Sequence, residues 1–254
     1  MERVKALLGP RGKKQRGLEK RFVADGLQSL RGALVPAVPT APLIDLLYLT
    51  DSGLEKLQSE FSDEVLAKHE TIMVTDQVMA AMADTQSPQG ILALCKYLPS
   101  DLTKFDAGTL KKVAYFWQIQ DPGNAGTAIR TADACGFDLV VFSDLSVDVY
   151  SPKVVRSTAG SLWNIPVVDD VPLDQLEEFS YRNNLSLVAL DGGAEQSLSD
   201  IDKTEPTVLV FGNEGHGLPE LAPAFQRISI PMRGRAESFN VASAAAIAMY
   251  YLSN

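Results

Sequence analysis

The chain has 254 residues, 46% of them hydrophobic, so it can bury the core of one large domain or two ordinary ones. Its formal net charge of -9, averaged over the whole chain, argues against a nucleic-acid surface. No apolar stretch approaches the roughly 18 residues of a membrane span, and the first residues are basic with an early Gly-Pro, unlike a signal peptide. We therefore expect a cytoplasmic protein without membrane contact.

The charge is distributed unevenly along the chain. Residues 1–33, here called the basic arm, contain nine Lys and Arg against three Asp and Glu, a net charge of +6 that leaves -15 for the remainder. A segment that follows an RNA phosphate backbone has this composition. Its candidate RNA contacts are Arg11, Lys13, Lys14 and Arg16. A solvated amphipathic helix around residues 17–24 explains the same charges without RNA, and charge alone does not separate the two interpretations.

Apolar stretches alternate with helical ones along the whole chain, which predicts an α/β fold with largely parallel sheets. The first unit contains expected strands at 43–49, 71–74 and 90–97, with expected helices at 53–60 and 77–83. A polar joint with the Pro, Ser, Asp and Gly of a linker follows them. We therefore expect a smaller N-terminal domain at 1–105 and a C-terminal domain at 106–254.

The second unit alternates strands and helices to its end. The expected elements are strand 112–118, helix 124–135, strand 138–143, helix 152–163, strand 165–168, helix 173–182, strands 185–190, 207–211 and 228–231, and a closing helix from 240. Apolar residues form one stripe of the 124–135 helix, and Arg130 lies opposite, where a solvated charge is usual. Asn124 suits the N-cap of this helix.

Two polar segments lie between short strands and the buried closing helix. The first, FGNEGHGL at 211–218, has three glycines within six residues, with Asn213 and Glu214 among them. These could be ordinary turn glycines, but the combination favours a backbone shaped around a ligand. In the second segment, at 233–240, Ser238 and Asn240 could bind a ligand or merely cap the closing helix.

Several enzyme classes lack their characteristic residues in this sequence. There is no G-x-x-x-x-G-K-[ST] and no G-x-G-x-x-G after a first strand, which excludes a P-loop nucleotidase and a dinucleotide-binding fold. No G-x-S-x-G turn presents a hydrolase serine. With two histidines and two distant cysteines, we expect no metal site.

The polar motifs together resemble the SpoU (TrmH) branch of the SPOUT RNA methyltransferases, which transfer a methyl group from S-adenosylmethionine to a ribose 2′-hydroxyl. Motif one is NAGTAIR at 124–130, motif two is FGNEGHG at 211–217, and motif three runs from IPM at 230–232 through SFNVA at 238–242. This resemblance covers about residues 111–252. The N-terminal unit more loosely resembles a ribosomal-protein-like substrate domain, through FVADGLQSL at 22–30 and SPQGILAL at 87–94.

The resemblance implies a knotted (trefoil) C-terminal domain with a mostly parallel sheet, a smaller N-terminal α/β RNA-binding domain, and a homodimer. It also implies that S-adenosylmethionine, the methyl donor, is bound in the knot. It assigns to the donor the backbone around Leu190, Gly212, Ile230, Met232 and Phe239, together with Asn213. The residues it assigns to the active site are Asn124, Arg130, Glu214, Ser238 and Asn240.

The resemblance leaves several roles open. The family assigns removal of the hydroxyl proton to the motif-one arginine, but a guanidinium stays protonated at neutral pH. We therefore prefer a role in which Arg130 stabilises the developing alkoxide or the adjacent phosphate, with Glu214 as an orienting group or a candidate base. Phe239 stands where leucine is common, which conserves an apolar wall. Arg156, Arg233 and Arg235 are further candidate RNA contacts, with a solvated charge as the alternative for each.

We therefore expect an S-adenosylmethionine-dependent RNA 2′-O-ribose methyltransferase that acts on ribosomal RNA. One alternative is a transfer RNA ribose methyltransferase. The other is a non-catalytic RNA-binding or ribosome-assembly protein of the same fold, against which the intact motif residues weigh.

Overall fold

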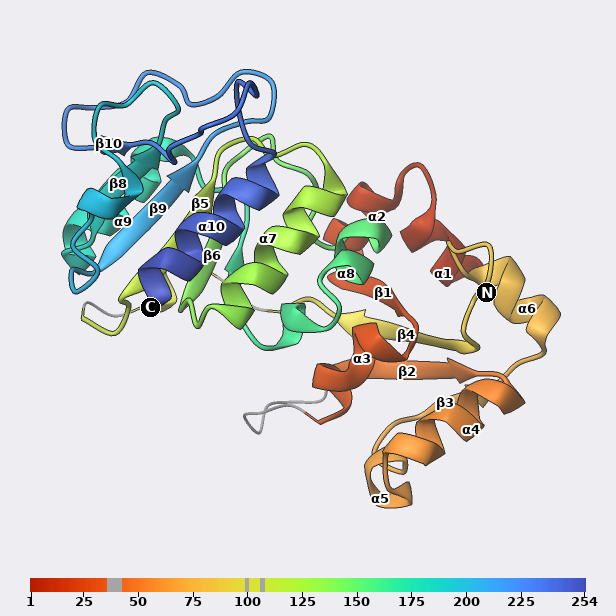
Figure 1. Ribbon diagram of the computed structural model, residues 1–254. Helices are drawn as coiled ribbons and strands as arrows, with labels where there is room; N and C mark the ends of the chain where they lie inside the picture. Colours follow the sequence, from red (N-terminus) through yellow and green to blue (C-terminus); the bar gives the residue numbers. More distant parts are fainter. Residues whose placement is uncertain (36–42, 99–100, 106–107) are drawn as a thin grey trace. The chain divides into compact units, whose positions relative to one another are not determined.

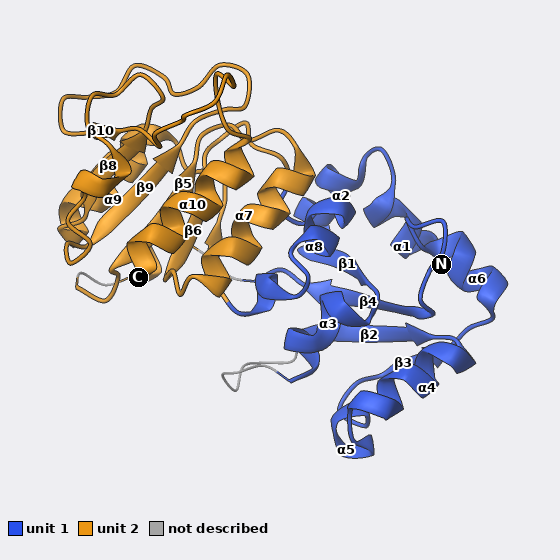
Figure 2. Cartoon of the chain, viewed as in Figure 1, with its two compact units in different colours: residues 1–99, 148–164 blue, residues 100–147, 165–254 orange. Residues whose placement is uncertain are grey.

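The computed structural model describes residues 1–35, 43–98, 101–105 and 108–254. The chain divides into two compact units: unit 1 contains residues 1–99 and 148–164, and unit 2 contains residues 100–147 and 165–254 (Figure 2). The domain boundary expected between residues 105 and 106 borders residues 106–107, outside the described ranges, and stays a prediction. The return of residues 148–164 to unit 1 was not expected from the sequence.

The described part of unit 1 contains a four-stranded sheet with the order β1-β4-β2-β3 (Figure 1). Strand β4 is antiparallel to both β1 and β2, whereas β2 and β3 are parallel. In chain order the elements of this unit are α1 (Glu2–Leu8), α2 (Gly12–Glu19), β1 (Arg21–Asp25), α3 (Leu27–Leu34), β2 (Ile44–Leu49), α4 (Asp51–Glu60), α5 (Asp63–Leu66), β3 (Thr71–Met73), α6 (Asp76–Met82), β4 (Ile91–Lys96), α8 (Pro152–Ser157) and the 3₁₀ helix η2 (Ser161–Trp163).

Strand β1 was missing from the expected elements, and the helix considered around residues 17–24 is wrong. Helix α2 ends at Glu19, and Lys20 takes a left-handed conformation with φ of 51°. The next residues pair with β4, and the three at the centre of β1, Phe22, Val23 and Ala24, are all buried. A strand covered on both faces lacks the alternation of polar and apolar residues that would identify it.

Each face of the unit 1 sheet has its own apolar core. On one face, Val23 of β1 and Leu92 of β4 pack with residues of α1 and α6. Phe22 lies on the opposite face, with its ring centroid 4.8 Å from that of Tyr150 and 5.5 Å from that of Trp163. Residues 148–164 therefore belong to unit 1 by packing, although they follow residues 108–147 of unit 2 in the chain.

Unit 2 contains, within the described residues, a parallel six-stranded sheet with the order β10-β8-β9-β5-β6-β7. Its elements are η1 (Leu102–Lys104), β5 (Lys112–Phe116), α7 (Pro122–Ala134), β6 (Leu139–Phe142), β7 (Val167–Val168), α9 (Leu173–Asn183), β8 (Ser186–Leu190), η3 (Leu198–Asp200), β9 (Thr207–Phe211), β10 (Gln226–Ile228) and α10 (Val241–Ser253). The expected α/β class and the mostly parallel C-terminal sheet are confirmed. The expected 152–163 helix ends earlier, at Ser157.

Helices cover both faces of the unit 2 sheet. Phe179 of α9 packs with Val113 and Tyr115 of β5 on one face. Because side chains alternate along a strand, Phe116 points to the other face, where α7 and α10 lie side by side (Figure 1). There its ring stacks with that of Phe211, with centroids 4.9 Å apart. No described helix in either unit is long and apolar enough to cross a membrane.

Candidate functional site

A cavity of about 530 Å³ lies in unit 2 at the carboxyl ends of β8 and β9. Ligands bind at this edge of open parallel sheets. The six predicted donor-binding residues all line the cavity: Leu190, Gly212, Asn213, Ile230, Met232 and Phe239. Three of the predicted active-site residues also line it: Glu214, Ser238 and Asn240. The structure therefore gathers into one cavity residues from three segments that are far apart in the sequence.

The glycine-rich segment after β9 forms a closed loop. Asn213 and Gly217 exchange backbone hydrogen bonds of 2.8 and 3.0 Å. The Asn213 side-chain oxygen accepts hydrogen bonds from the backbone N–H groups of Gly215 and His216, at 2.8 and 3.1 Å. A Cβ on Gly212 would lie 2.6 Å from the carbonyl carbon of Gly217, so this position requires glycine. The Asn213 side chain thus holds the loop that lines the cavity.

The Glu214 carboxylate lies at the N-terminus of α7. It accepts hydrogen bonds from the backbone N–H groups of Gln120 and Asp121, at 3.3 and 3.4 Å, and from Asn124 Nδ2 at 3.2 Å. Both the free N–H groups and the dipole of a helix N-terminus favour a negative charge there. Glu214 is therefore held by motif one, 90 residues earlier in the chain.

A second asparagine continues this network to α10. Asn240 Nδ2 donates to Asn124 Oδ1 at 3.1 Å, and Asn240 Oδ1 accepts from the backbone N–H groups of Ala242 and Ser243. Asn240 is thus both the N-cap of α10 and a partner of motif one. The N-cap role expected for Asn124 is wrong, because α7 begins at Pro122 and its N-cap is Asp121. That leaves the Asn124 side chain for Glu214 and Asn240.

Sequence reasoning missed three polar residues around this network. Gln118 follows β5 in a left-handed conformation with φ of 46°, and its carbonyl accepts hydrogen bonds from Asn213 Nδ2 and Gln120 Nε2, at 2.7 and 3.0 Å. Its N–H donates to Oγ of the buried Ser143, which follows β6, at 2.7 Å. Gln118 and Ser143 follow the carboxyl ends of two neighbouring parallel strands, and this position could have identified them as site residues.

Arg130 does not line the cavity. It is exposed on α7, six residues beyond Asn124, a rise of about 9 Å along a helix. The structure therefore does not bring Arg130 together with the other four predicted active-site residues within one chain. Its catalytic role stays a prediction.

The basic arm differs from its expectation at Arg16. The Arg16 side chain is buried, its Nε donates to Asp148 Oδ2 at 3.0 Å, and its Nη1 donates to the carbonyl of Leu7. Burial among these partners leaves no phosphate-binding surface, so the expected RNA contact at Arg16 is corrected. Arg11, Lys13 and Lys14 are exposed and stay predictions.

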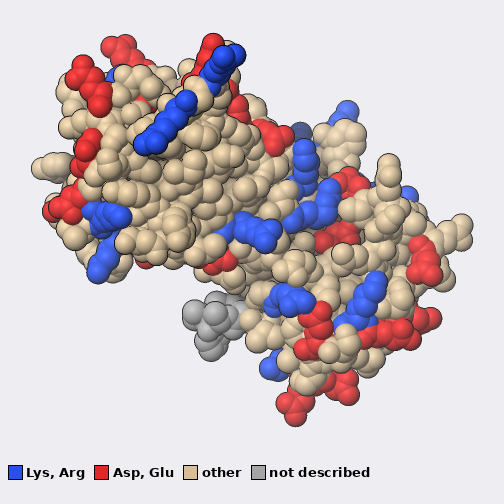
Figure 3. Space-filling model, viewed as in Figure 1, with Lys and Arg blue, Asp and Glu red and all other residues tan. Residues whose placement is uncertain are grey.

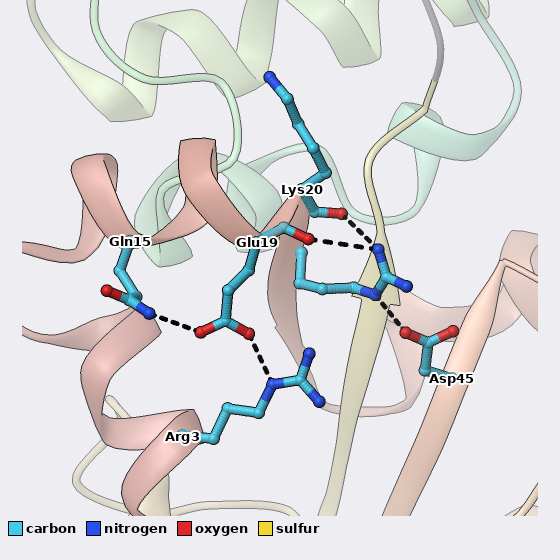
Figure 4. Close-up of polar contacts among 6 residues, drawn as sticks. Arg3, Gln15, Glu19, Lys20 and Asp45 are labelled. Atoms are coloured by element: carbon cyan, nitrogen blue, oxygen red, sulfur yellow. Dashed lines mark hydrogen bonds and ion pairs between the residues drawn. The ribbon is translucent and has the colours of Figure 1, made fainter.

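Other charges of the basic arm bind carboxylates of unit 1. Arg3 Nε and Gln15 Nε2 each donate to Glu19 at 2.6 Å (Figure 4). These hydrogen bonds, first from Gln15 and then from Arg3, lower the pKa of the Glu19 carboxyl. Figure 3 shows acidic side chains beside Lys and Arg on the surface of both units. A count of charges over residues 1–33 thus overstates the free positive charge.

Of the remaining predicted RNA contacts, one is paired with a carboxylate and two are exposed. Arg156 on α8 is partly buried and pairs with Asp84, with Nη2 3.1 Å from Oδ2. Nearby, burial raises the pKa of Asp25, against a hydrogen bond from Thr85 and the charge of Arg156, both of which lower it. Arg233 and Arg235 lie exposed in the segment before α10.

No described cluster of three or more His, Cys, Asp or Glu residues is arranged to hold a metal ion.

Comparisons with known proteins point in one direction. The model of the SpoU rRNA Methylase family matches residues 111–250, and that of the MRM3-like substrate binding domain matches residues 2–93. The chain is 36% identical to the 23S rRNA (guanosine(2553)-2′-O)-methyltransferase RlmP of Bacillus subtilis, over 74% of this chain and 79% of that protein. It is 32% identical to the 23S rRNA (uridine(2479)-2′-O)-methyltransferase of Streptomyces viridochromogenes, over 96% of this chain and 86% of the relative.

A solved structure has the same architecture along nearly the whole chain. The AdoMet-bound rRNA methyltransferase from Sinorhizobium meliloti superposes with a TM-score of 0.84 at 27% identity, covering 99% of this chain and 92% of that one. The superposition therefore includes both units and the cavity of unit 2.

Proposed function

This chain belongs to the SpoU rRNA methylase family, and we propose that it transfers a methyl group from S-adenosylmethionine to a ribose 2′-hydroxyl of ribosomal RNA. The observation that carries the proposal is the cavity at the ends of β8 and β9, with the hydrogen-bonded Glu214, Asn124 and Asn240 at its edge. Both named relatives modify 23S rRNA, and this favours ribosomal RNA over transfer RNA. We also propose a cytoplasmic location.

The cavity fits S-adenosylmethionine in size and chemistry. Its volume of about 530 Å³ is within the roughly 300–1,000 Å³ of small-molecule sites. Leu190, Ile230 and Met232 supply apolar surface, and a Cβ at Gly192 would meet no atom within 4 Å, so the backbone there borders open space. When bound, the donor supplies an electrophilic methyl group on a sulfonium. We propose that the family's trefoil knot forms this cavity.

We assign Glu214 to positioning. Its two carboxylate oxygens already accept three hydrogen bonds, and the bond from Asn124 Nδ2 fixes which way that amide faces. Asn124 Oδ1 then faces Asn240, which α10 holds in place through its N-cap. We propose that Asn240 and Ser238, both on the cavity wall, hold the acceptor ribose in line with the methyl group. Such orientation supplies much of the acceleration of a displacement reaction.

Arg130 is assigned to stabilising the developing alkoxide or the adjacent phosphate. Because it does not line the cavity of its own chain, this role requires that the bound RNA or a second copy of the chain complete the site. We propose a homodimer through the outer face of α10. Ile247 and Tyr250 are 38% and 67% exposed there, beside an apolar hollow that Leu198 and Tyr251 also line.

The test is a titration with S-adenosylmethionine by calorimetry, followed by transfer of labelled methyl to unmodified ribosomal RNA and to transfer RNA, with nuclease mapping of the product. We expect donor binding and labelled 2′-O-methyl nucleotide in ribosomal RNA. Label in transfer RNA alone would replace the substrate class. A chain that binds no donor would not be an enzyme of this kind.

A further inference from the structure

Phe239 exposes an aromatic ring at the wall of the cavity. The residue lines the cavity, yet it is 41% exposed. It lies between Ser238 and Asn240, the two residues proposed to hold the acceptor ribose. An exposed aromatic side chain next to reacting groups offers an apolar face that a ligand can cover.

The fold leaves about two fifths of this residue uncovered. Phe239 precedes the N-cap Asn240, and a hydrophobic residue at that position ordinarily packs against the fourth residue of the helix. In α10 that residue is Ala244, which also lines the cavity. A single methyl group covers only a small part of a phenyl ring. A contribution to the helix end therefore does not account for a side chain as large as phenylalanine.

The backbone that carries the ring is fixed. Asn240 Oδ1 accepts hydrogen bonds from Ala242 N–H at 2.9 Å and Ser243 N–H at 3.3 Å, and Ala244 N–H donates to the Asn240 carbonyl at 2.9 Å. Asn240 Nδ2 is tied to Asn124 at 3.1 Å, and the next residue, Val241, is buried. Binding a flat ligand on the ring therefore requires little ordering of the main chain.

We propose that the exposed face of Phe239 stacks on the base of the RNA nucleotide whose ribose is methylated. The inference rests on the proposed function, because it assumes an RNA acceptor at this cavity. A ribose that enters the cavity must leave the regular stack of its strand, and its base then loses a neighbour. An aromatic ring beside Ser238 and Asn240 replaces that neighbour, as aromatic side chains do for unstacked bases in RNA-binding proteins.

The segment that carries Phe239 has two arginines and one carboxylate, Glu237, which lines the cavity. Arg233 and Arg235 are exposed in the same segment, between β10 and α10, where they can contact the phosphates beside a splayed nucleotide. Stacking does not distinguish strongly among bases, because every base has a π-face. Phe239 would therefore supply affinity for the acceptor and leave the choice of base to other contacts.

The competing occupant of the ring is the adenine of the methyl donor. The two are separated by measuring donor affinity and acceptor kinetics on the same variants: Phe239→Leu, Phe239→Ala and Phe239→Trp. Donor affinity is measured by calorimetry with S-adenosylmethionine alone. Acceptor KM and kcat are measured with unmodified 23S ribosomal RNA transcribed in vitro. Tyr181→Leu on α9 is the matched control, because Tyr181 is 86% exposed and lies outside the cavity.

We expect Phe239→Ala to raise the KM for RNA about 5- to 150-fold, the range measured for loss of a base–aromatic stack. Phe239→Leu should give a smaller rise, Phe239→Trp should keep the wild-type KM, and Tyr181→Leu should change nothing. The resemblance assigns the backbone around Phe239 to the donor, and these substitutions keep that backbone, so donor affinity should stay within about twofold in all four variants. A merely structural role for the ring would not produce rescue by tryptophan together with unchanged donor binding.

Three results would overturn the inference. A loss of donor affinity in Phe239→Ala would assign the ring to the donor's adenine. An unchanged KM in Phe239→Ala would show that no base stacks there. A wild-type protein that binds donor but methylates no ribosomal RNA would remove the proposed function and this inference together, whereas wild-type transfer with normal Phe239→Ala kinetics would remove the inference alone.

Discussion

The cavity of unit 2 and the basic arm of unit 1 were both predicted from short sequence features, and the structure treats them differently. At the cavity, all six predicted donor positions line the same space. In the basic arm, Arg16 is buried against Asp148, and Arg3 binds Glu19. A motif whose residues lie at strand and helix ends thus predicts the positions of its side chains better than a cluster of charges does.

The physical reason is how each set of side chains finds its partners. Asn124, Glu214 and Asn240 lie at the ends of elements, and the parallel sheet brings those ends to one edge whatever the rest of the chain does. A charged side chain on a short helix instead pairs with whichever carboxylate the fold places beside it. For Arg16 that carboxylate is 132 residues away.

The largest effect that separates the two regions should come from Arg16→Met. The substitution leaves Asp148 without its buried cation, and breaking a buried ion pair from one side costs about 3–5 kcal/mol. We therefore expect a large drop in the free energy of unfolding, measured by urea denaturation. The double variant with Asp148→Asn should lose less than the sum of the two single losses. If Arg16→Met unfolds like the wild type and binds RNA more weakly, the original expectation of an RNA contact is restored.

Arg130→Ala should give the next largest effect, and on activity instead of stability. The side chain is exposed and does not line the cavity, so unfolding and donor affinity should match the wild type. Loss of an electrostatic stabiliser lowers turnover by about 10²-fold or more. Single-turnover methyl transfer to ribosomal RNA, at saturating donor, measures this. Wild-type turnover would remove Arg130 from the active site and leave the cavity network to account for catalysis.

Much of the fold could be predicted because hydrophobic periodicity records burial. The strands of the parallel sheet are short apolar runs, which predicted them. Asn213 and Glu214 were predicted as site residues because they are polar residues within a glycine-rich turn. What failed depended on tertiary contacts. Strand β1 is buried on both faces, so its three central residues do not alternate with polar ones. The place of residues 148–164 depends on Tyr150 and Trp163 packing against Phe22, a contact between distant segments that local patterns do not record.

A smaller effect is expected where the basic arm keeps free charges. Arg11, Lys13 and Lys14 are exposed, so replacing all three by alanine should leave stability unchanged and weaken RNA binding. Each lost phosphate contact should lower the slope of log affinity against log salt by about 1. Substitution is preferable to deleting the arm, because Val4 and Leu7 are part of the unit 1 core. An unchanged salt slope would make the arm a solvated surface.

The smallest effect should come from Asp25→Asn in unit 1, and its sign depends on pH. Burial raises the pKa of Asp25, so folding favours the protonated carboxyl, and this stability is complete below the ordinary value near 3.9 and lost as pH rises through the raised value. Asparagine does not ionise and still accepts the hydrogen bond from Thr85. The variant should therefore exceed the wild type in denaturation midpoint at pH 7 and match it near pH 4. Asp84→Asn, which loses the ion pair with Arg156, should change stability in the opposite direction at pH 7. If Asp25→Asn is instead less stable at pH 7, the attraction between Arg156 and the ionised Asp25 outweighs the cost of burying that charge. The charged side chains of unit 1 would then stabilise the fold more than the comparison with the cavity assumes.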